Sequence, residues 1–207
     1  MSQEHYFSSE PTTKKTETKI SFEVAGREFN MSAASGTFSA TKLDPGTKVL
    51  LGNFKLFPKD GNVLDLGCGW GPIGVTIACL SPETKVFSID INKRSVDQTL
   101  ANAKISDAKN LEAMLADELP KNLRFTAIWS NPPIRIGKEA LHALMHSYIP
   151  KLEPLGKAYF VVQKNLGSDS LQRWLEESFP DHQIRRVGTE KSYRVLEVIS
   201  PANVLSK

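Results

Sequence analysis

Apolar and polar positions alternate in a regular rhythm along most of the chain. From residue 62 onward, short apolar runs typical of buried strands are separated by stretches with helical periodicity. The strand-like runs are Val63–Leu66, Val86–Ile89, Ala113–Ala116, Phe125–Trp129 and Ala158–Val162. The helical stretches are 72–80, 93–105, 138–149 and 168–179. This alternation predicts an α/β fold, with a doubly wound, mostly parallel sheet that carries helices on both faces.

Near each end of the chain, two strand-like runs follow one another with no helical stretch between them. Residues 182–188 and 193–199 are strand-like and are joined by a short polar segment, which predicts an antiparallel hairpin at one edge of the sheet. Near the N-terminus, Ile20, Phe22 and Val24 alternate with polar residues before a glycine-containing turn. This second pattern predicts a β-hairpin outside the parallel sheet.

Three segments follow from this organisation. Residues 1–19 are polar and lack apolar periodicity, so we expect a flexible arm. Residues 20–56 hold the N-terminal hairpin and a short helix that Asp44 or Thr47 caps, and we expect them to form an appendage. Residues 57–207 form the α/β domain.

Composition and charge exclude several classes of protein. The 207 residues carry 26 Lys and Arg against 23 Asp and Glu, a formal net charge of +3, and 40% are hydrophobic. This small surplus does not by itself indicate a nucleic-acid-binding protein. No apolar run approaches the roughly 18 residues that span a bilayer, and the N-terminus lacks the apolar core of a signal peptide. Two cysteines cannot make a disulfide scaffold, so we expect a cytoplasmic protein without a membrane partner.

A glycine-rich loop directly follows the first strand-like run of the α/β domain. Its sequence over residues 65–72 is DLGCGWGP. The glycines let the backbone turn tightly beside a ligand, and the helix that follows offers unpaired N–H groups. Asp90 ends the next strand, where a carboxylate suits the hydroxyl groups of a ribose. An ordinary strand-to-helix turn is the alternative, but the combination with Asp90 favours a nucleoside-containing cofactor.

The spacing of this loop discriminates between two cofactors. A dinucleotide fingerprint requires Gly-x-Gly-x-x-Gly, whereas the sixth position counted from Gly67 is Pro72. The Asp65 carboxylate would repel a pyrophosphate, but it suits a ligand that carries an ammonium group. S-adenosylmethionine contains an adenosine and an ammonium group and no phosphate. Charge therefore favours S-adenosylmethionine over NAD.

A second motif, Ser130-Asn131-Pro132-Pro133, ends the fourth strand-like run. Ligands bind at the carboxyl ends of parallel strands, so this turn is expected beside the glycine loop. Because prolines have no N–H, the turn presents two acceptors, the Asn131 side-chain oxygen and the Pro132 carbonyl. Two acceptors match the hydrogens of a planar NH₂ group and would stabilise its nitrogen as it pyramidalises. A plain proline turn is the alternative, but the glycine loop favours a catalytic role for Asn131, Pro132 and Pro133.

By the glycine loop and the Asn-Pro-Pro turn, the chain resembles class I S-adenosylmethionine-dependent methyltransferases. It is most similar to the small-domain family that includes bacterial enzymes acting on guanine N2 of small-subunit ribosomal RNA. The resemblance extends over residues 20–199 and also rests on Gly36–Ser39, Asp44–Thr47 and Lys191–Val195. It implies a seven-stranded sheet with a reversed final hairpin. The positions that it assigns to cofactor binding are Thr47, Asp65, Gly67, Cys68, Gly69, Asp90, Ile91, Asp117 and Asn131.

One position departs from the pattern of the family. The residue after Asn-Pro-Pro is an aromatic that stacks on the target base in many relatives, and here it is Ile134. Ile134, Arg135 and Lys138 flank the catalytic turn, so we expect them to bind the substrate. His142 and His146 lie one helical turn apart, but the glutamate of a zinc-hydrolase motif is missing, so we expect no metal.

We therefore expect an enzyme that uses S-adenosylmethionine to methylate an exocyclic amine of RNA. Guanine N2 of small-subunit ribosomal RNA is the preferred target, and a monomer is the default oligomeric state. Two alternatives stay open. The same chemistry could act on a protein side-chain amide or a small-molecule amine, or the fold could serve as an RNA-binding module without catalysis.

Overall fold

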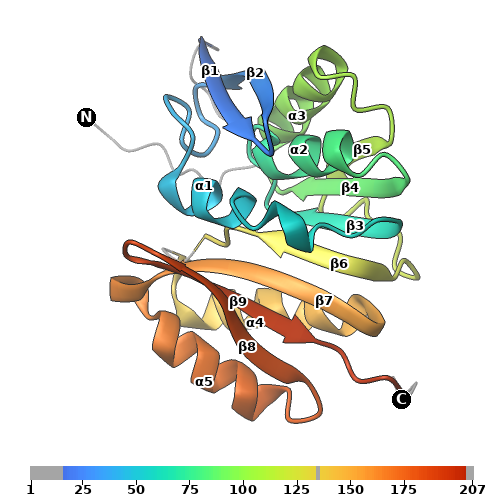
Figure 1. Ribbon diagram of the computed structural model, residues 1–207, viewed down its shortest axis with the longest axis vertical. Coiled ribbons are helices and arrows are strands. Elements are labelled where there is room, and N and C mark those ends of the chain that lie inside the picture. Colours follow the sequence, from blue (N-terminus) through green and yellow to red (C-terminus); the bar gives the residue numbers. More distant parts are fainter. Residues whose placement is uncertain (1–15, 134–135, 204–207) are drawn as a thin grey trace.

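The computed structural model describes residues 16–133 and 136–203, and its centre is a seven-stranded sheet (Figure 1). The strand order is β5-β4-β3-β6-β7-β9-β8, in which β5 to β7 are parallel and β9 is antiparallel to both of its neighbours. The strands are β3 (Gly61–Leu66), β4 (Thr84–Asp90), β5 (Leu111–Leu115), β6 (Phe125–Ser130), β7 (Leu152–Gln163), β8 (Gln183–Glu190) and β9 (Tyr193–Ile199). The expected parallel sheet with a reversed final hairpin is confirmed.

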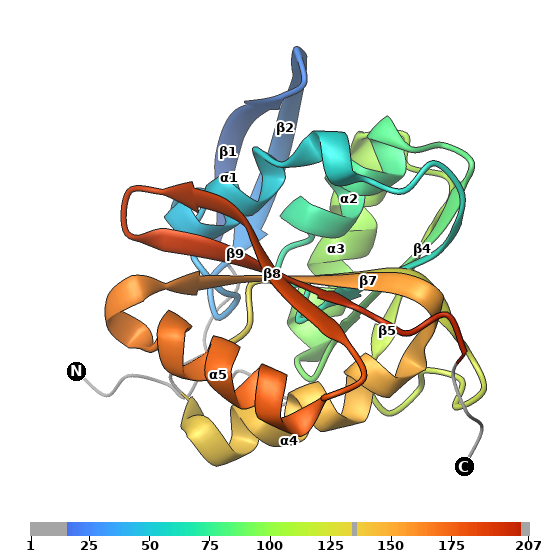
Figure 2. The same cartoon turned by 60° about the horizontal axis from the view of Figure 1, so that its bottom comes forward.

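Helices cover both faces of this sheet (Figure 2). One face carries α1 (Pro45–Leu51), α2 (Pro72–Leu80) and α3 (Lys93–Ile105). The other face carries α4 (Lys138–Tyr148) and α5 (Ser168–Ser178). Short 3₁₀ turns lie at η1 (Phe54–Leu56), η3 (Ile149–Lys151) and η4 (Lys164–Leu166).

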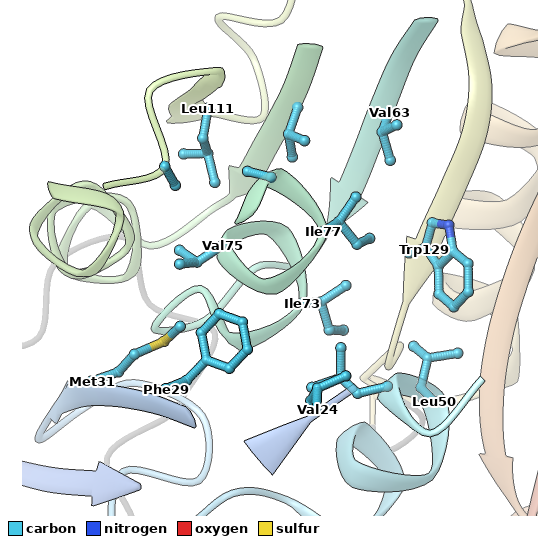
Figure 3. Close-up of a cluster of buried hydrophobic side chains, with 14 of the residues drawn as sticks. Val24, Phe29, Met31, Leu50, Val63, Ile73, Val75, Ile77, Leu111 and Trp129 are labelled. Atoms are coloured by element: carbon cyan, nitrogen blue, oxygen red, sulfur yellow. The ribbon is translucent and has the colours of Figure 1, made fainter. Parts of the chain in front are cut away.

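The central strands are mostly apolar because consecutive residues enter two different hydrophobic cores. In β6, Trp129 packs in the core beneath α1 and α2, whereas Ile128 packs in the core beneath α4 and α5. Figure 3 shows the first core, where Val63 and Trp129 of the sheet face Ile73 and Ile77 of α2. A strand buried on both faces has no polar alternation, which explains the short continuous apolar runs in the sequence.

The N-terminal segment forms a separate two-stranded hairpin, β1 (Glu17–Val24) and β2 (Arg27–Ala34). Its two-residue turn places both Ala25 and Gly26 at positive φ, as the twist of a hairpin favours. Its apolar side, which includes Phe29 and Met31, faces α2 (Figure 3). The predicted arm overlaps β1 at Glu17–Lys19, residues 1–15 lie outside the described part of the chain, and the division into three segments stays a prediction.

A buried side-chain amide joins this hairpin to the α/β domain. Asn102 on α3 accepts a hydrogen bond from the Ser32 N–H (2.9 Å) and donates to the Ser32 carbonyl (2.7 Å) and the Trp70 carbonyl (2.7 Å). Gln98 adds a bond to the same Ser32 carbonyl. The amide of Asn102 thus satisfies the outward-facing peptide groups of β2 in the way that a neighbouring strand would.

This junction has consequences at the sheet edge where the candidate site lies. Residues 35–43 form the loop between β2 and α1. At the beginning of this loop, the Asn92 side chain donates a hydrogen bond to the Gly36 carbonyl (3.0 Å), and the Arg94 side chain donates one to the Ser35 carbonyl (2.9 Å). Both side chains belong to the segment that follows β4. The loop between the hairpin and α1 is therefore tied to the carboxyl end of β4.

Truncation of the amide in Asn102→Ala should leave two backbone groups, the Ser32 N–H and the Trp70 carbonyl, without this hydrogen-bond partner, whereas the Ser32 carbonyl keeps its bond from Gln98. Each unsatisfied group costs about 1–3 kcal/mol, so we expect the free energy of unfolding to fall by roughly 2–4 kcal/mol in denaturant titrations. Lys104→Ala, on the exposed side of the same helix, is the matched control and should change it by less than about 0.5 kcal/mol. Equal stability of the two variants would contradict this account of the junction.

Candidate active site

The glycine loop and the Asn-Pro-Pro turn meet at the carboxyl edge of the sheet. The N–H groups of Gly67 and Cys68 both donate to the carbonyl of Ile89 (2.9 Å each), which folds the loop over the end of β4. The Ser130 hydroxyl donates to the carbonyl of Leu66 (2.7 Å), which joins the ends of β6 and β3. The two motifs that the sequence singled out are therefore adjacent, as predicted.

The glycine loop presents an open backbone surface. Gly67 and Gly69 have φ of +77° and +59°, a region that residues with a Cβ adopt only under strain. Among the described residues, no atom beyond Gly67 and its two chain neighbours lies within 4 Å of the point that a Cβ on Gly67 would occupy. The loop can thus approach a ligand closely at Gly67.

Asp65 lies beneath this loop and is fully buried. One carboxylate oxygen accepts hydrogen bonds from the Gly74 N–H (2.9 Å) and the Ser88 hydroxyl (3.2 Å). Among the described residues, the other oxygen, Oδ1, is buried without a partner. Burial raises the pKa of Asp65 to about 7, with a smaller contribution from the negative charge of Asp90 and an opposing effect of the two hydrogen bonds. A buried carboxylate with a free oxygen is suited to a cationic ligand group.

Sequence reasoning did not assign a purpose to Gly74, which the structure explains. A Cβ at this position would lie 2.7 Å from Asp65 Oδ2 and 2.1 Å from the Ser88 hydroxyl oxygen. Only a glycine lets the helix backbone approach the carboxylate closely enough to donate to it. The signal in the sequence is a glycine inside a helix, where it costs stability relative to alanine.

Asp90 is held at the end of β4 by backbone donors. Its Oδ2 accepts from the Gly69 N–H and its Oδ1 from the Asn92 N–H, both at 2.9 Å. Burial raises the pKa of Asp90, against the effect of these bonds. The next residue, Ile91, is 51% exposed, and Asp117 is exposed in the turn after β5. The Ala116 N–H donates to the Asp90 carbonyl (3.0 Å), so the predicted nucleoside-binding residues lie next to one another.

The side chain of Asn131 has a defined orientation. Its amide nitrogen donates to Asp44 Oδ1 (2.7 Å) and to the Thr47 hydroxyl (3.0 Å). Because a carboxylate only accepts hydrogen bonds, the NH₂ group must face Asp44, and the amide oxygen faces away from it. The same Asp44 oxygen caps α1 by accepting from the Thr47 N–H (3.0 Å). Sequence reasoning proposed Asp44 only as a helix cap, because nothing in the linear spacing links it to Asn131.

Of the remaining predicted site residues, the structure describes Pro132, Pro133 and Lys138. Pro132 is buried, and the Pro133 carbonyl accepts from the Ile136 N–H (3.1 Å). Lys138 is exposed at the first position of α4, five residues after Pro133 in the sequence. Ile134 and Arg135 lie outside the described residues.

Cys68 is a packing residue in this arrangement. Its side chain is buried, and its sulfur accepts a hydrogen bond from the Thr99 hydroxyl (3.3 Å). Burial, together with the charges of Asp65 and Asp90, raises the pKa of the thiol well above its ordinary value. Such a thiol is a poor nucleophile, and a contact between Cys68 and the cofactor stays a prediction.

Residues 16–133 and 136–203 show neither a metal-binding cluster nor a membrane-spanning helix. This part of the chain contains no group of three His, Cys, Asp or Glu side chains arranged for a metal ion. It also contains no helix with the length and apolar character needed to cross a bilayer. His142 and His146 instead pack against the ring of Trp174.

The site residues fit S-adenosylmethionine by their chemistry. The free oxygen of Asp65 suits an ammonium group, the Asp90 carboxylate suits a ribose diol, and the surface at Gly67 is open. With Asn131 at the adjacent strand end, this fold and site define a class I S-adenosylmethionine-dependent methyltransferase.

Comparison with known families agrees with this class. The family model described as "Methyltransferase small domain" matches residues 28–197, and the chain belongs to this family. The resemblance expected from the sequence motifs is confirmed.

Two curated relatives illustrate the family. The Bacillus subtilis (strain 168) protein described as "Uncharacterized protein YbxB" is 32% identical over 197 residues, which cover 94% of this chain and 97% of that protein. Ribosomal RNA small subunit methyltransferase C of Pseudoalteromonas translucida is 31% identical over 165 residues, or 77% of this chain and 47% of that enzyme. The chain thus spans about half the length of that ribosomal RNA methyltransferase.

Solved structures share the fold. The T. thermophilus 16S rRNA N2 methyltransferase RsmC, in complex with AdoMet and guanosine, superposes with a TM-score of 0.76 at 25% identity. The match covers 92% of this chain and 52% of RsmC. The ribosomal protein L11 methylase of Lactobacillus delbrueckii subsp. bulgaricus has a TM-score of 0.63 at 20% identity over 77% of this chain and 83% of the methylase, a likeness of fold alone.

The raised pKa of Asp65 predicts how stability depends on pH. Below about pH 4 the carboxyl is protonated in both states, and between pH 4 and 7 the unfolded chain releases its proton while the folded chain keeps it. The contribution of Asp65 to the free energy of unfolding therefore falls as pH rises to about 7, by up to ~1.4 kcal/mol per pH unit.

Chemical unfolding of Asp65→Asn at a series of pH values checks this expectation. The variant lacks the titrating group, so the fall between pH 4 and 7 should be smaller than in the wild type. Asp60→Asn, at an exposed carboxylate, controls for the loss of one negative charge. Parallel stability curves for the wild type and Asp65→Asn would contradict the raised pKa.

Proposed function

We propose that this protein transfers a methyl group to an exocyclic amine of RNA, with guanine N2 of small-subunit ribosomal RNA as the preferred target. The observation that carries the proposal is the orientation of Asn131, whose amide oxygen is directed away from Asp44 at the end of β6. The similarity to ribosomal RNA small subunit methyltransferase C and to RsmC supports RNA as the substrate class.

The residues proposed to hold S-adenosylmethionine line the ends of β3, β4 and β5. Asp65 binds the ammonium group through its free oxygen, and Asp90 binds the ribose hydroxyls. Ile91 covers one face of the adenine, and Asp117 accepts from the adenine amine. Backbone groups of Gly67, Cys68 and Gly69 border the methionine end, with Thr47 and Asn131 beside it. When bound, the cofactor supplies a methyl group on a sulfonium, which is already an electrophile and needs no covalent enzyme intermediate.

The catalytic contribution of the chain is to bind a planar amine by both of its hydrogens. The lone pair of such a nitrogen is delocalised, so the free amine is a poor nucleophile. Asn131 Oδ1 and the Pro132 carbonyl accept the two N–H groups and become stronger acceptors as the nitrogen gains positive charge, which stabilises the transition state. The rigid proline turn supplies orientation. No general base is required before transfer, because the proton can leave the nitrogen afterwards.

Basic side chains beside the catalytic turn are suited to an RNA backbone. Lys138 is exposed at the start of α4, and Arg135 lies three residues before it in the sequence. We propose that both bind phosphate and that Ile134 covers the substrate. The net charge of +3 and the aliphatic Ile134 are the observations that favour the second candidate, methylation of a protein side-chain amide or a small-molecule amine.

Labelling with methyl-labelled S-adenosylmethionine distinguishes these substrates. Wild-type protein added to a cell extract should transfer label to RNA, in the small-subunit ribosomal RNA fraction. Label found only in protein or in small molecules would exclude RNA as the substrate. Asn131→Ala removes one acceptor, so we expect the rate to fall about 100-fold or more while the affinity for S-adenosylmethionine stays within a few-fold. Asn62→Ala, at the opposite edge of the sheet, is the matched control.

Asp44→Ala should reduce turnover through Asn131. Without the carboxylate the amide can rotate, and a misplaced acceptor lowers kcat by about tenfold or more. The variant also loses a helix cap, which costs about 1 kcal/mol of stability. Asp44→Asn keeps an oxygen that can accept from both Asn131 and the Thr47 N–H, so it should retain most of the activity. The measurement is kcat under steady-state conditions. If kcat falls as much in Asp44→Asn as in Asp44→Ala, an acceptor oxygen at position 44 is not what orients Asn131.

A further inference from the structure

Tyr193 lies at the same edge of the sheet as the candidate active site. It opens β9 and pairs with Gln163 at the carboxyl end of β7. The two-residue turn before it, Lys191-Ser192, is tied to β7 by a hydrogen bond from the Lys164 N–H to the Ser192 carbonyl (2.6 Å). Figure 1 shows this β8–β9 turn beside α1, on the side where the parallel strands end. The backbone that carries the tyrosine is therefore held in a fixed place.

The ring faces the side of the sheet that Asn131 also faces. Tyr193 and Val195 contact the core beneath α1, whereas Leu196 enters the opposite core. Asn131 follows Trp129 by two residues and reaches the cap of α1 with its side chain. Tyr193 and Asn131 thus share a face as well as an edge.

A close approach at Gly46 connects the ring with the group that orients Asn131. A Cβ on Gly46 would lie 3.1 Å from Tyr193 Cε1 and 3.0 Å from Asp44 Oδ1. Gly46 has a helical backbone, so its conformation does not require glycine. The absence of a side chain instead makes room for the ring next to Asp44. Burial, and then the charge of Asp44, raise the pKa of the Tyr193 hydroxyl, as expected for this position.

The order of the strands places the ring on the substrate side of Asn131. Apart from Thr47 and Asn131, the residues proposed to bind the cofactor lie at the ends of β3, β4 and β5, on one side of β6, whereas β7 and β9 lie on the other side. An amine bound at Asn131 faces the donor on the first side, so the rest of the substrate extends toward the second. Another exposed aromatic residue, Phe38, lies against Gly69 and therefore on the donor side.

We infer that Tyr193 forms an aromatic wall of the pocket for the target base and so determines specificity for a planar substrate. This inference rests on the proposed function. The ring is only partly buried, which leaves surface for a base to contact. The residue after Asn-Pro-Pro is the aliphatic Ile134, which offers no ring for a base to stack on, whereas Tyr193 on β9 offers one.

Steady-state kinetics on 16S ribosomal RNA transcribed in vitro test the inference. We expect Tyr193→Leu to raise the KM for RNA about 10- to 100-fold, as the loss of one aromatic–base stack would, with a smaller change in kcat. Tyr193→Phe should keep the wild-type KM within about threefold, because it keeps the ring. The affinity for S-adenosylmethionine, measured by calorimetry, should be unchanged in both variants. Tyr148→Leu, a matched loss of an aromatic ring on α4, should leave the KM unchanged.

A second measurement covers the case in which Tyr193→Leu does not fold. RNA that carries 6-thioguanosine is irradiated in the presence of wild-type protein, and the cross-linked residues are identified by mass spectrometry. A cross-link at Tyr193 is expected, and a pattern without it overturns the inference.

The outcomes separate this inference from the proposed function. If the wild type methylates RNA and folded Tyr193→Leu has the wild-type KM, the aromatic wall is wrong and the proposed function stands. A wild type that methylates no RNA overturns both. A rise in KM in Tyr193→Phe equal to that in Tyr193→Leu would show that the hydroxyl, and not stacking, is responsible.

Discussion

Parallel pairing of β3, β4 and β6 is the constraint on which the site depends. Strands that run side by side in the same direction end at the same edge, so the segments that follow them converge there. The glycine loop, Asp90 and Asn131 are far apart in the chain but belong to these three ends. Two local bonds complete the convergence: the Ser130 hydroxyl joins β6 to β3, and backbone groups of the loop donate to Ile89 at the end of β4.

The N-terminal segment does more than pack beside the α/β domain, because it helps to orient a residue of the candidate site. Asn102 and Gln98 hold the hairpin against α3, which positions the loop that leads to α1. At the start of α1, Asp44 accepts a hydrogen bond from Asn131 and thereby decides that the amide oxygen faces away from Asp44. The amide oxygen would have no fixed direction if only the proline turn held it. Segments before and after the glycine loop thus orient the Asn131 side chain together.

Much of the fold could be predicted because buried parallel strands leave a strong pattern. The helix expected at 93–105 is observed with the same bounds, and the strand expected from Val63 is observed from Gly61. The bounds of a strand were predicted less well where its residues do not form a regular pattern of apolar positions. The strand expected at Ala158–Val162 begins earlier, at Leu152. Its first part was missed because Pro154, Leu155 and Lys157 are exposed, so the segment carries no continuous apolar run, and Leu155 has a positive φ.

By itself, the sequence determined the class of fold, the glycine loop and the identity of the acceptors at Asn131 and Pro132. Those features are local, since they depend on periodicity, on residues without a Cβ and on residues without an N–H. Only the tertiary structure decided that Asp44 holds the amide of Asn131, that Gly74 contacts Asp65 and that Tyr193 lies beside Gly46. These pairs come together through strand order and helix packing, and no spacing along the chain records a contact of that kind.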